Sequence, residues 1–136
     1  FFLLNKKCYF VDLPGYGYAA VAHAARLEWA DVMGDYLATR PSLAGVVLLI
    51  DIRRGVTELD RRLADWLAPA RRPVLVLLTK ADKLPYGQRI KAVFAVKKQL
   101  EDLGNLQAIP FSATARLGLD EATARITNWI SPQVVP

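Results

Sequence analysis

The chain has 136 residues, 53% of them hydrophobic and 23% charged, which suits one globular, soluble domain with a substantial core. Its longest apolar run, residues 44–50, is far shorter than the ~20 residues of a membrane-spanning helix, which excludes a transmembrane interpretation. The formal net charge of +5 predicts a mild attraction to polyanions such as RNA, although a solvated basic surface explains it equally well.

The start of the chain predicts a β-hairpin, because the apolar runs FFLL and CYFV flank Asn5, Lys6 and Lys7. The basic residues follow the apolar run, the reverse of a secretory signal, and no initiator methionine is present, so we expect a fragment. The only cysteine, Cys8, has no partner for a disulfide or a metal site, which favours a reducing, cytoplasmic location.

Short apolar segments alternate with segments of helical period along the rest of the chain. We expect buried strands at residues 9–13, 46–52, 74–79 and, with a weaker pattern, 107–112. Helices are expected at residues 21–39, 57–68, 88–103 and 119–130. Continuous hydrophobicity in strands is typical of a parallel sheet covered on both faces. The alternation therefore predicts a doubly wound α/β domain, with the hairpin adding an antiparallel edge.

In the helix expected at residues 88–103, the apolar side chains share one face, which predicts that they are buried. They are Ile90, Val93, Phe94, Leu100 and Leu103. The charged residues lie elsewhere on this helix, and Gly104 and Asn105 supply its stop.

A polar segment follows each expected strand, at the edge where parallel sheets bind their ligands. These segments are Asp12-Leu13-Pro14-Gly15, Asp51-Ile52-Arg53-Arg54-Gly55, Thr79-Lys80-Ala81-Asp82 and Ser112-Ala113. Each segment alone also fits a helix cap or a simple turn. Their joint occurrence at one edge predicts a ligand site.

These segments resemble motifs of the EngB family of P-loop GTPases. VDLPGYGYA resembles the family's phosphate-sensing motif, LLTKADKL its guanine-reading motif and FSA its final base-contact loop. LLIDIRRGVTELD also resembles the family. The similarity runs through essentially the whole chain, and it implies one partial G domain at residues 1–136, with GTP or GDP as ligand and Mg²⁺ as cofactor.

The first motif has the chemistry expected beside the terminal phosphate of a nucleotide. A Mg²⁺ ion there needs an anionic oxygen to hold its waters, and Asp12 can supply it at the strand tip. Gly15 lets a backbone N–H approach the phosphate because no side chain blocks it. Pro14 restricts its own φ and the conformation of Leu13, so we expect these four residues to form a nucleotide-binding turn.

The second motif suits guanine, because the acceptor-only carboxylate of Asp82 matches the N1–H and N2 amine donors that adenine lacks. The resemblance implies that Lys80 lays its alkyl stem over the base and that Thr79 steadies the loop. It also implies that the N–H of Ala113 contacts the guanine O6. The nucleotide-binding residues expected here are Thr79, Lys80, Ala81, Asp82, Phe111, Ser112 and Ala113. Either motif alone also fits an ordinary exposed loop.

Hydrolysis in this class is an in-line attack of water on the γ-phosphate, and many members place a water-orienting Gln after the Asp-x-x-Gly turn. This chain has Tyr16 there, and a phenol does not reproduce the geometry of an amide. We expect slow turnover, or a catalytic group from a partner or another loop, and assign no catalytic residue. Gly17 and Tyr18 are expected in a segment that switches between nucleotide states, with packing of Tyr16 and Tyr18 on the next helix as the alternative.

A P-loop requires G-x-x-x-x-G-K-[ST], and no glycine in these 136 residues is followed by lysine. We therefore interpret the sequence as an N-terminally truncated fragment without the central P-loop strand. In the family's fold that strand lies between the strands that end at Asp12 and Asp51. Its loss predicts unpaired strand edges, and hence self-association or direct pairing of those two strands.

The resemblance implies a guanine-nucleotide switch with slow GTP hydrolysis that assists assembly of the large ribosomal subunit and is needed for normal cell division and septation. Its partners would include rRNA and no membrane, and its location would be cytoplasmic. The fragment alone is expected to be weak or inactive. The alternative is a degenerate, non-hydrolysing interaction module that retains the GTPase fold, and a flavodoxin-like protein explains the strand order but not the guanine-reading residues.

Overall fold

The computed structural model describes residues 2–5, 8–10 and 22–130. The strands are β1 (Phe2–Asn5), β2 (Cys8–Phe10), β3 (Val46–Asp51), β4 (Val74–Thr79) and β5 (Leu106–Pro110). The helices are α1 (His23–Thr39), α2 (Glu58–Leu67), the one-turn 3₁₀ helix η1 (Ala81–Lys83), α3 (Tyr86–Gln99) and α4 (Leu119–Ile130). The expected order of strands and helices is confirmed over the described residues.

β3, β4 and β5 form a parallel sheet with β4 in the middle. Val46 is opposite Val74, and Val74 is opposite Leu106, so the three strands start level and end at one edge. Every residue of β4 except Thr79 is buried. A strand in this position needs apolar side chains on both faces, which explains the unbroken run VLVLL.

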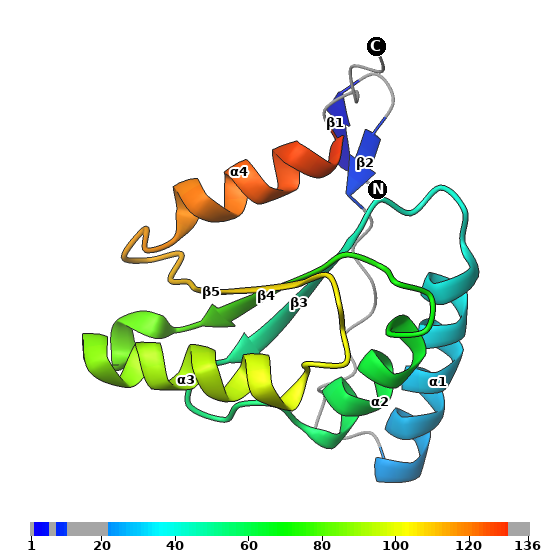
Figure 1. Cartoon of the computed structure of the whole chain (residues 1–136), viewed down its shortest axis with the longest axis horizontal. Coiled ribbons are helices and arrows are strands. Elements are labelled where there is room, and N and C mark those ends of the chain that lie inside the picture. The colour runs from blue at the N-terminus through cyan, green and yellow to red at the C-terminus, as the bar shows by residue number, and fades with distance from the viewer. Residues whose placement is uncertain (1, 6–7, 11–21, 131–136) are drawn as a thin grey trace.

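Helices cover both faces of this sheet (Figure 1). On one face, Val76 and Leu78 of β4 pack in a cluster with Leu67 of α2 and Leu100, which follows α3. On the other face, Leu75 and Leu77 of β4 and Ile109 of β5 pack against Ala122 of α4, with Trp129 at the margin. The predicted doubly wound α/β architecture is therefore confirmed.

The two helices α1 and α2 pack closely against each other beside the sheet. A capping box fixes the start of α2: Thr57 N–H donates to the Asp60 carboxylate at 3.0 Å, and Asp60 N–H donates to the Thr57 hydroxyl at 3.2 Å. Gly34 of α1 lies against Trp66 of α2, and a Cβ atom at residue 34 would approach the indole Cγ to 2.5 Å. The glycine thus permits close approach of the two helices.

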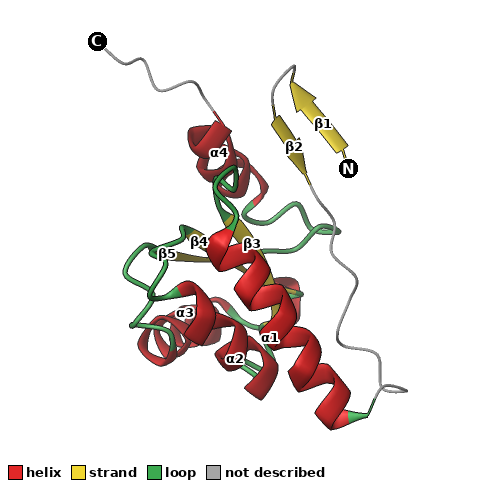
Figure 2. Ribbon diagram, turned by 90° about the vertical axis from the view of Figure 1, so that its right-hand side faces the viewer, coloured by secondary structure: helices red, strands yellow, loops and turns green. Residues whose placement is uncertain are grey.

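The predicted hairpin is confirmed, because β1 and β2 pair antiparallel with Phe2 opposite Phe10. It forms a sheet of its own rather than an edge of the parallel sheet (Figure 2). Direct pairing of the first predicted strand with β3 is not found among the described residues, where β2 pairs with β1 and β3 pairs with β4. The short strand β2 forms its backbone hydrogen bonds with β1 and not with β3. One edge of β3 therefore has no strand beside it within the described chain.

The bounds and the exposed face of α3 differ from prediction. The helix begins two residues earlier than expected because Pro85 occupies the N-cap, and it ends at Gln99. Ile90 and Phe94, predicted to be buried, are 40% and 70% exposed, so that prediction was wrong for both residues. The buried side of α3 is centred on Val96, and successive residues turn by roughly 100°, which directs Ile90 and Phe94 outward.

Within residues 22–130 and the two hairpin strands, no helix is long and apolar enough to cross a membrane.

Candidate functional site

Two loops that follow β4 and β5 meet at the carboxyl edge of the sheet. Ala81, fully buried after β4, donates its N–H to the carbonyl of Phe111 at 3.0 Å, and Phe111 donates its N–H to the carbonyl of Leu78 at 2.8 Å. The sheet ladder therefore continues past the ends of both strands. The structure brings the two predicted base-reading segments together on one rigid support.

The first of these loops holds Lys80 in the left-handed region, with φ at 59°. A non-glycine residue there costs about 1 kcal/mol or more, and such conformations gather at functional sites. The loop is steadied on both sides: Thr79 donates its hydroxyl to the carbonyl of Ile50 at 3.4 Å, and Arg89 Nε lies 2.8 Å from the carbonyls of both Ala81 and Leu84. The strained turn is thus fixed by neighbours from β3 and α3.

Asp82 leaves its carboxylate open at this edge. Its side chain is 29% exposed, and the nearest cation is Lys83 Nζ at 4.0 Å. Among the described residues no hydrogen-bond donor reaches the carboxylate. Both carboxylate oxygens are therefore available to donors of a ligand.

The loop after β5 is closed by Ser112. This residue is 2% exposed, exchanges two backbone hydrogen bonds of 3.0 Å with Leu117, and accepts the N–H of Ala115 on its hydroxyl at 3.2 Å. Gly118, with φ at 74°, completes the turn. A Cβ atom at this position would lie 2.2 Å from the carbonyl oxygen of Pro110, so only glycine fits there. Ala113 is exposed, and its N–H has no acceptor in the part of the chain that the structure describes. It is thus open to an acceptor such as a carbonyl oxygen.

A charged cluster at the end of β3 borders the same loops. Asp51 accepts the backbone N–H of Arg53 at 2.9 Å and two guanidinium bonds from Arg53 at 3.2 and 3.1 Å, and its Oδ2 lies 3.7 Å from Lys80 Nζ. The hydrogen bonds from the Arg53 guanidinium lower the pKa of Asp51 from 3.8 to about 2. Asp51 thereby anchors the ammonium group of Lys80 from the neighbouring strand.

Sequence reasoning missed this role of Asp51 and Arg53. It noted that their segment follows a strand, but gave neither residue a function. The available signal was the D-x-R spacing directly after a buried strand, which places the guanidinium within reach of the carboxylate. The link to Lys80 depends on the parallel register of β3 and β4, so it required the structure.

The predicted phosphate turn and switch lie outside the described residues. These are Asp12, Leu13, Pro14, Gly15, Tyr16, Gly17 and Tyr18. In the described ranges no group of three or more acidic, histidine or cysteine side chains is arranged to hold a metal. Asp51 is unsuited to Mg²⁺ because Arg53 and Lys80 already engage its carboxylate.

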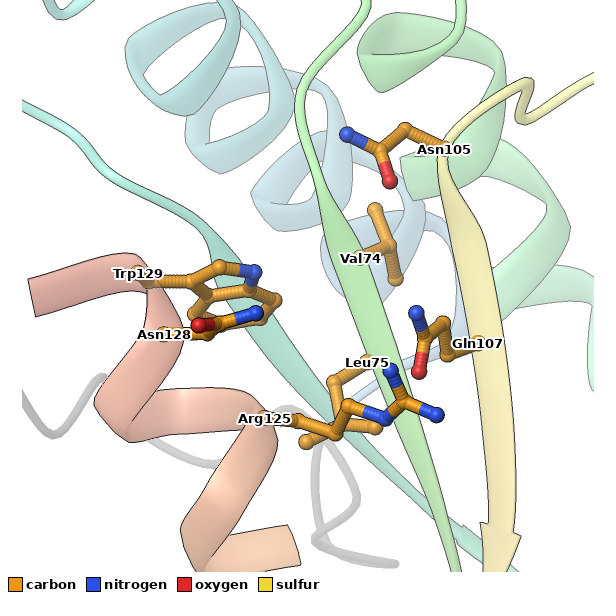
Figure 3. Close-up of a pocket in the computed structure, with 7 residues that line it drawn as sticks. All are labelled: Val74, Leu75, Asn105, Gln107, Arg125, Asn128 and Trp129. Carbon is orange, nitrogen blue, oxygen red and sulfur yellow. The ribbon is translucent and has the colours of Figure 1, made fainter. Parts of the chain in front are cut away.

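A small pocket lies elsewhere, near the start of β4, between α4 and β5 (Figure 3). Its volume is about 40 Å³, and its lining includes Asn105, Gln107, Arg125 and Trp129. This space suits a water molecule but not a nucleotide. A wider, open groove of about 680 Å³ lies along α1 and α2, away from the predicted ligand-binding segments. The carboxyl edge is the candidate site because those segments meet there with an open carboxylate and an open N–H.

Comparison with known proteins relates these loops to a family. Residues 2–80 match the family model described as "50S ribosome-binding GTPase". The chain is also 67% identical, over 94% of its length, to a probable GTP-binding protein EngB of Bordetella pertussis. The chain belongs to the EngB family of GTPases. It spans 62% of the length of that Bordetella relative.

Solved structures agree with the EngB fold. A probable GTP-binding protein EngB matches with a TM-score of 0.67 and 19% identity, over 86% of this chain and 74% of the other. Elongation factor SelB from Methanococcus maripaludis, in its apo form, matches with a TM-score of 0.66 and 21% identity, over 92% of this chain and 25% of the other. At these identities the likeness shows the fold alone, which is the α/β GTPase fold.

Proposed function

We propose that the carboxyl edge of the sheet binds the base of a guanine nucleotide. The observation that carries the proposal is the hydrogen bond from Ala81 N–H to the carbonyl of Phe111, which joins the two loops. One loop offers the Asp82 carboxylate as an acceptor, and the other offers the Ala113 N–H as a donor. A rigid pair of loops with open groups of both kinds suits a flat ligand that carries donors and an acceptor on one edge.

Guanine has this arrangement. Its N1–H and N2 amine lie side by side and match the two oxygens of Asp82, while its O6 accepts the Ala113 N–H. Adenine has an amine where guanine has O6, and it has no N1–H. Bound adenine would leave the carboxylate unpaired and set two donors against each other, which strongly disfavours it.

Lys80 and Thr79 complete the proposed base site. The ammonium group of Lys80 is drawn toward Asp51, at 3.7 Å, which leaves its alkyl stem to cover a base held by Asp82. The hydroxyl of Thr79 ties the start of the loop to β3. Phe111 through its backbone, and Ser112 through its backbone and its hydroxyl, hold the second loop in place.

For the phosphates we propose the turn from Asp12 to Gly15, with Asp12 holding Mg²⁺ through water. When bound, the ion would neutralise the charge of the phosphate oxygens. Tyr16, Gly17 and Tyr18 would follow this turn as the switch segment. The chemistry of the residue types supports these assignments, since a carboxylate and a glycine N–H suit a hydrated cation and a phosphate.

We also propose that the protein is a cytoplasmic GTP-binding switch with slow hydrolysis, which assists large-subunit assembly at rRNA and supports cell division and septation. The name of the family model and those of the Bordetella relatives support the ribosomal and GTP-binding parts. Residues 1–136 would form one partial G domain, and the open edge of β3 would permit self-association. A non-hydrolysing interaction module is the second candidate, favoured by the lack of a P-loop motif in these 136 residues.

The substitution Asp82→Asn tests the base site. An asparagine amide can donate to the carbonyl that xanthine carries at position 2, so preference should change from GDP to XDP. We expect at least a tenfold weaker affinity for GDP, measured by competition with a fluorescent GDP analogue. Asp35→Asn, which removes the same charge from α1, is the control and should keep the preference for GDP. An unchanged preference in the Asp82 variant would remove the proposed role.

A further inference from the structure

The outer side of α3 carries apolar side chains that nothing in the described structure covers. Phe94 is 70% exposed, Ile90 is 40% exposed, and Tyr86 at the start of the helix is 73% exposed. Their spacing of four residues places them along one flank of the helix. A large aromatic ring held in water is unusual for a helix that also has a well-buried side, centred on Val96.

All charged residues of α3 are basic. α3 contains Arg89, Lys91, Lys97 and Lys98 and no acidic residue. Arg89 donates to the backbone carbonyls of Ala81 and Leu84, but the three lysines are exposed. In the described part of the chain none of these lysines forms an ion pair, whereas Arg53, Arg61 and Arg62 all do.

The lysines surround the exposed ring. Lys91, Lys97 and Lys98 are three before, three after and four after Phe94, and Ile90 is four before it. Positions three and four apart are neighbours on a helix surface, so three free ammonium groups border one aromatic face. We name these five residues, Ile90, Lys91, Phe94, Lys97 and Lys98, the α3 patch.

We propose that the α3 patch binds unpaired RNA, with Phe94 stacked on a base and the three lysines on the flanking phosphates. An open aromatic ring within a positive border is the combination that single-stranded nucleic acids use, since every base has a π-face and every linkage a charge. A peptide of acidic residues alone would satisfy the lysines but would leave the ring exposed. The inference rests on the proposed ribosomal role and deepens it by naming the contact surface.

The patch is preformed, which favours binding. Arg89 Nε lies 2.8 Å from the carbonyls of Ala81 and Leu84 and so ties the first turns of α3 to the loop after β4. Val96 and Leu100 anchor the other end in the core, where they are 2% and 0% exposed. Little conformational freedom remains to be lost in the helix when a ligand docks.

The test measures binding of a fluorescein-labelled, mixed-sequence single-stranded RNA by anisotropy across a salt series. Phe94→Ala should weaken binding roughly 5- to 150-fold, and Phe94→Trp should retain it, because a base stacked on an aromatic ring contributes about 1–3 kcal/mol. Lys91→Gln with Lys98→Gln should lower the slope of log affinity against log salt by about 1.4. Val32→Ala, 58% exposed on α1, and Arg125→Gln on α4 are the matched controls and should change neither value.

Three results would overturn the proposal. If Phe94→Ala left the RNA affinity unchanged, the patch would attract RNA through its charge alone and not through base stacking. Tighter binding of polyglutamate than of RNA, lost in the lysine variant, would mean an acidic protein partner. Absence of RNA binding by the native chain would exclude the site outright. GDP binding, measured on the same variants, should stay at the native value, so that loss of RNA binding is distinguishable from failure of the proposed nucleotide site.

Discussion

The neighbouring strands β4 and β3 differ in how completely the described structure supports them. β4 pairs on both sides, and Leu75, Val76 and Leu78 have no measurable exposure. Among the described residues β3 pairs with β4 alone, and its Leu49 is 62% exposed. The loop after β4 follows the strand that is paired on both sides, whereas the Asp51 cluster follows the strand that has an open edge in the described chain. The proposed base-binding loop after β4 therefore extends from the more completely packed strand.

The largest expected effect is a difference in the free energy of unfolding between variants of β4 and of β3. Leu78→Ala in β4 should lower the free energy of unfolding by about 2–5 kcal/mol, because it leaves a cavity in the enclosed cluster. Leu49→Ala in β3 should change it by no more than about 0.5 kcal/mol, since that side chain is mostly in water. Urea denaturation of both variants measures the difference. Equal losses would mean that β3 is buried to the same extent as β4.

A smaller effect concerns the carboxylate at the end of β3. The pKa of Asp51 is lowered from 3.8 to about 2 by Arg53, so its ionised form stabilises the fold above pH 3.8. This contribution is lost as the pH falls through about 2. We expect Asp51→Asn to cost about 1 kcal/mol at neutral pH, because the half-exposed Arg53 is partly screened.

The control for this prediction lies within the same pH series. Below about pH 2 the side chain at residue 51 becomes neutral in both proteins, so their unfolding free energies should converge as the pH falls through that value. A constant difference between the two proteins from neutral to acid pH would show that the charge of Asp51 contributes nothing.

The smallest expected effect on stability comes from the exposed face of β3. Leu49→Lys should leave the unfolding free energy within about 0.5 kcal/mol of the native value and should reduce self-association, because a charge blocks edge-to-edge contact. Light scattering over a concentration series measures the association. Val32→Lys, at a similarly exposed site on α1, is the control and should leave association unchanged. Equal association of all three proteins would show that β3 is not the contact.

The sequence predicts well what is local and periodic. The apolar run of β4 and the Thr-Lys-Ala-Asp segment after it require only neighbours in the chain, and both are where the pattern places them. The loop after β5 was predicted only from its position after the last expected strand. The hydrogen bond from Ala81 to Phe111 confirms that it lies beside the loop after β4. Their roles toward a nucleotide stay predictions.

What depends on three-dimensional context could not be predicted. The apolar pattern of α3 does not say which of two overlapping faces the sheet covers, so Phe94 was assigned to the core although it is exposed. The contact of Asp51 with Lys80 arises from parallel register between strands separated by α2. The separate hairpin likewise follows from pairing choices that short apolar runs do not encode.

The most direct test of the proposed guanine site is calorimetric titration of the 136-residue chain with GDP, with ADP as the control. The proposed guanine site predicts weak but saturable heat with GDP and none with ADP, because the loops after β4 and β5 are held together before any ligand arrives. Equal heats with both nucleotides, or none with GDP from a chain that circular dichroism shows to be folded, would contradict it.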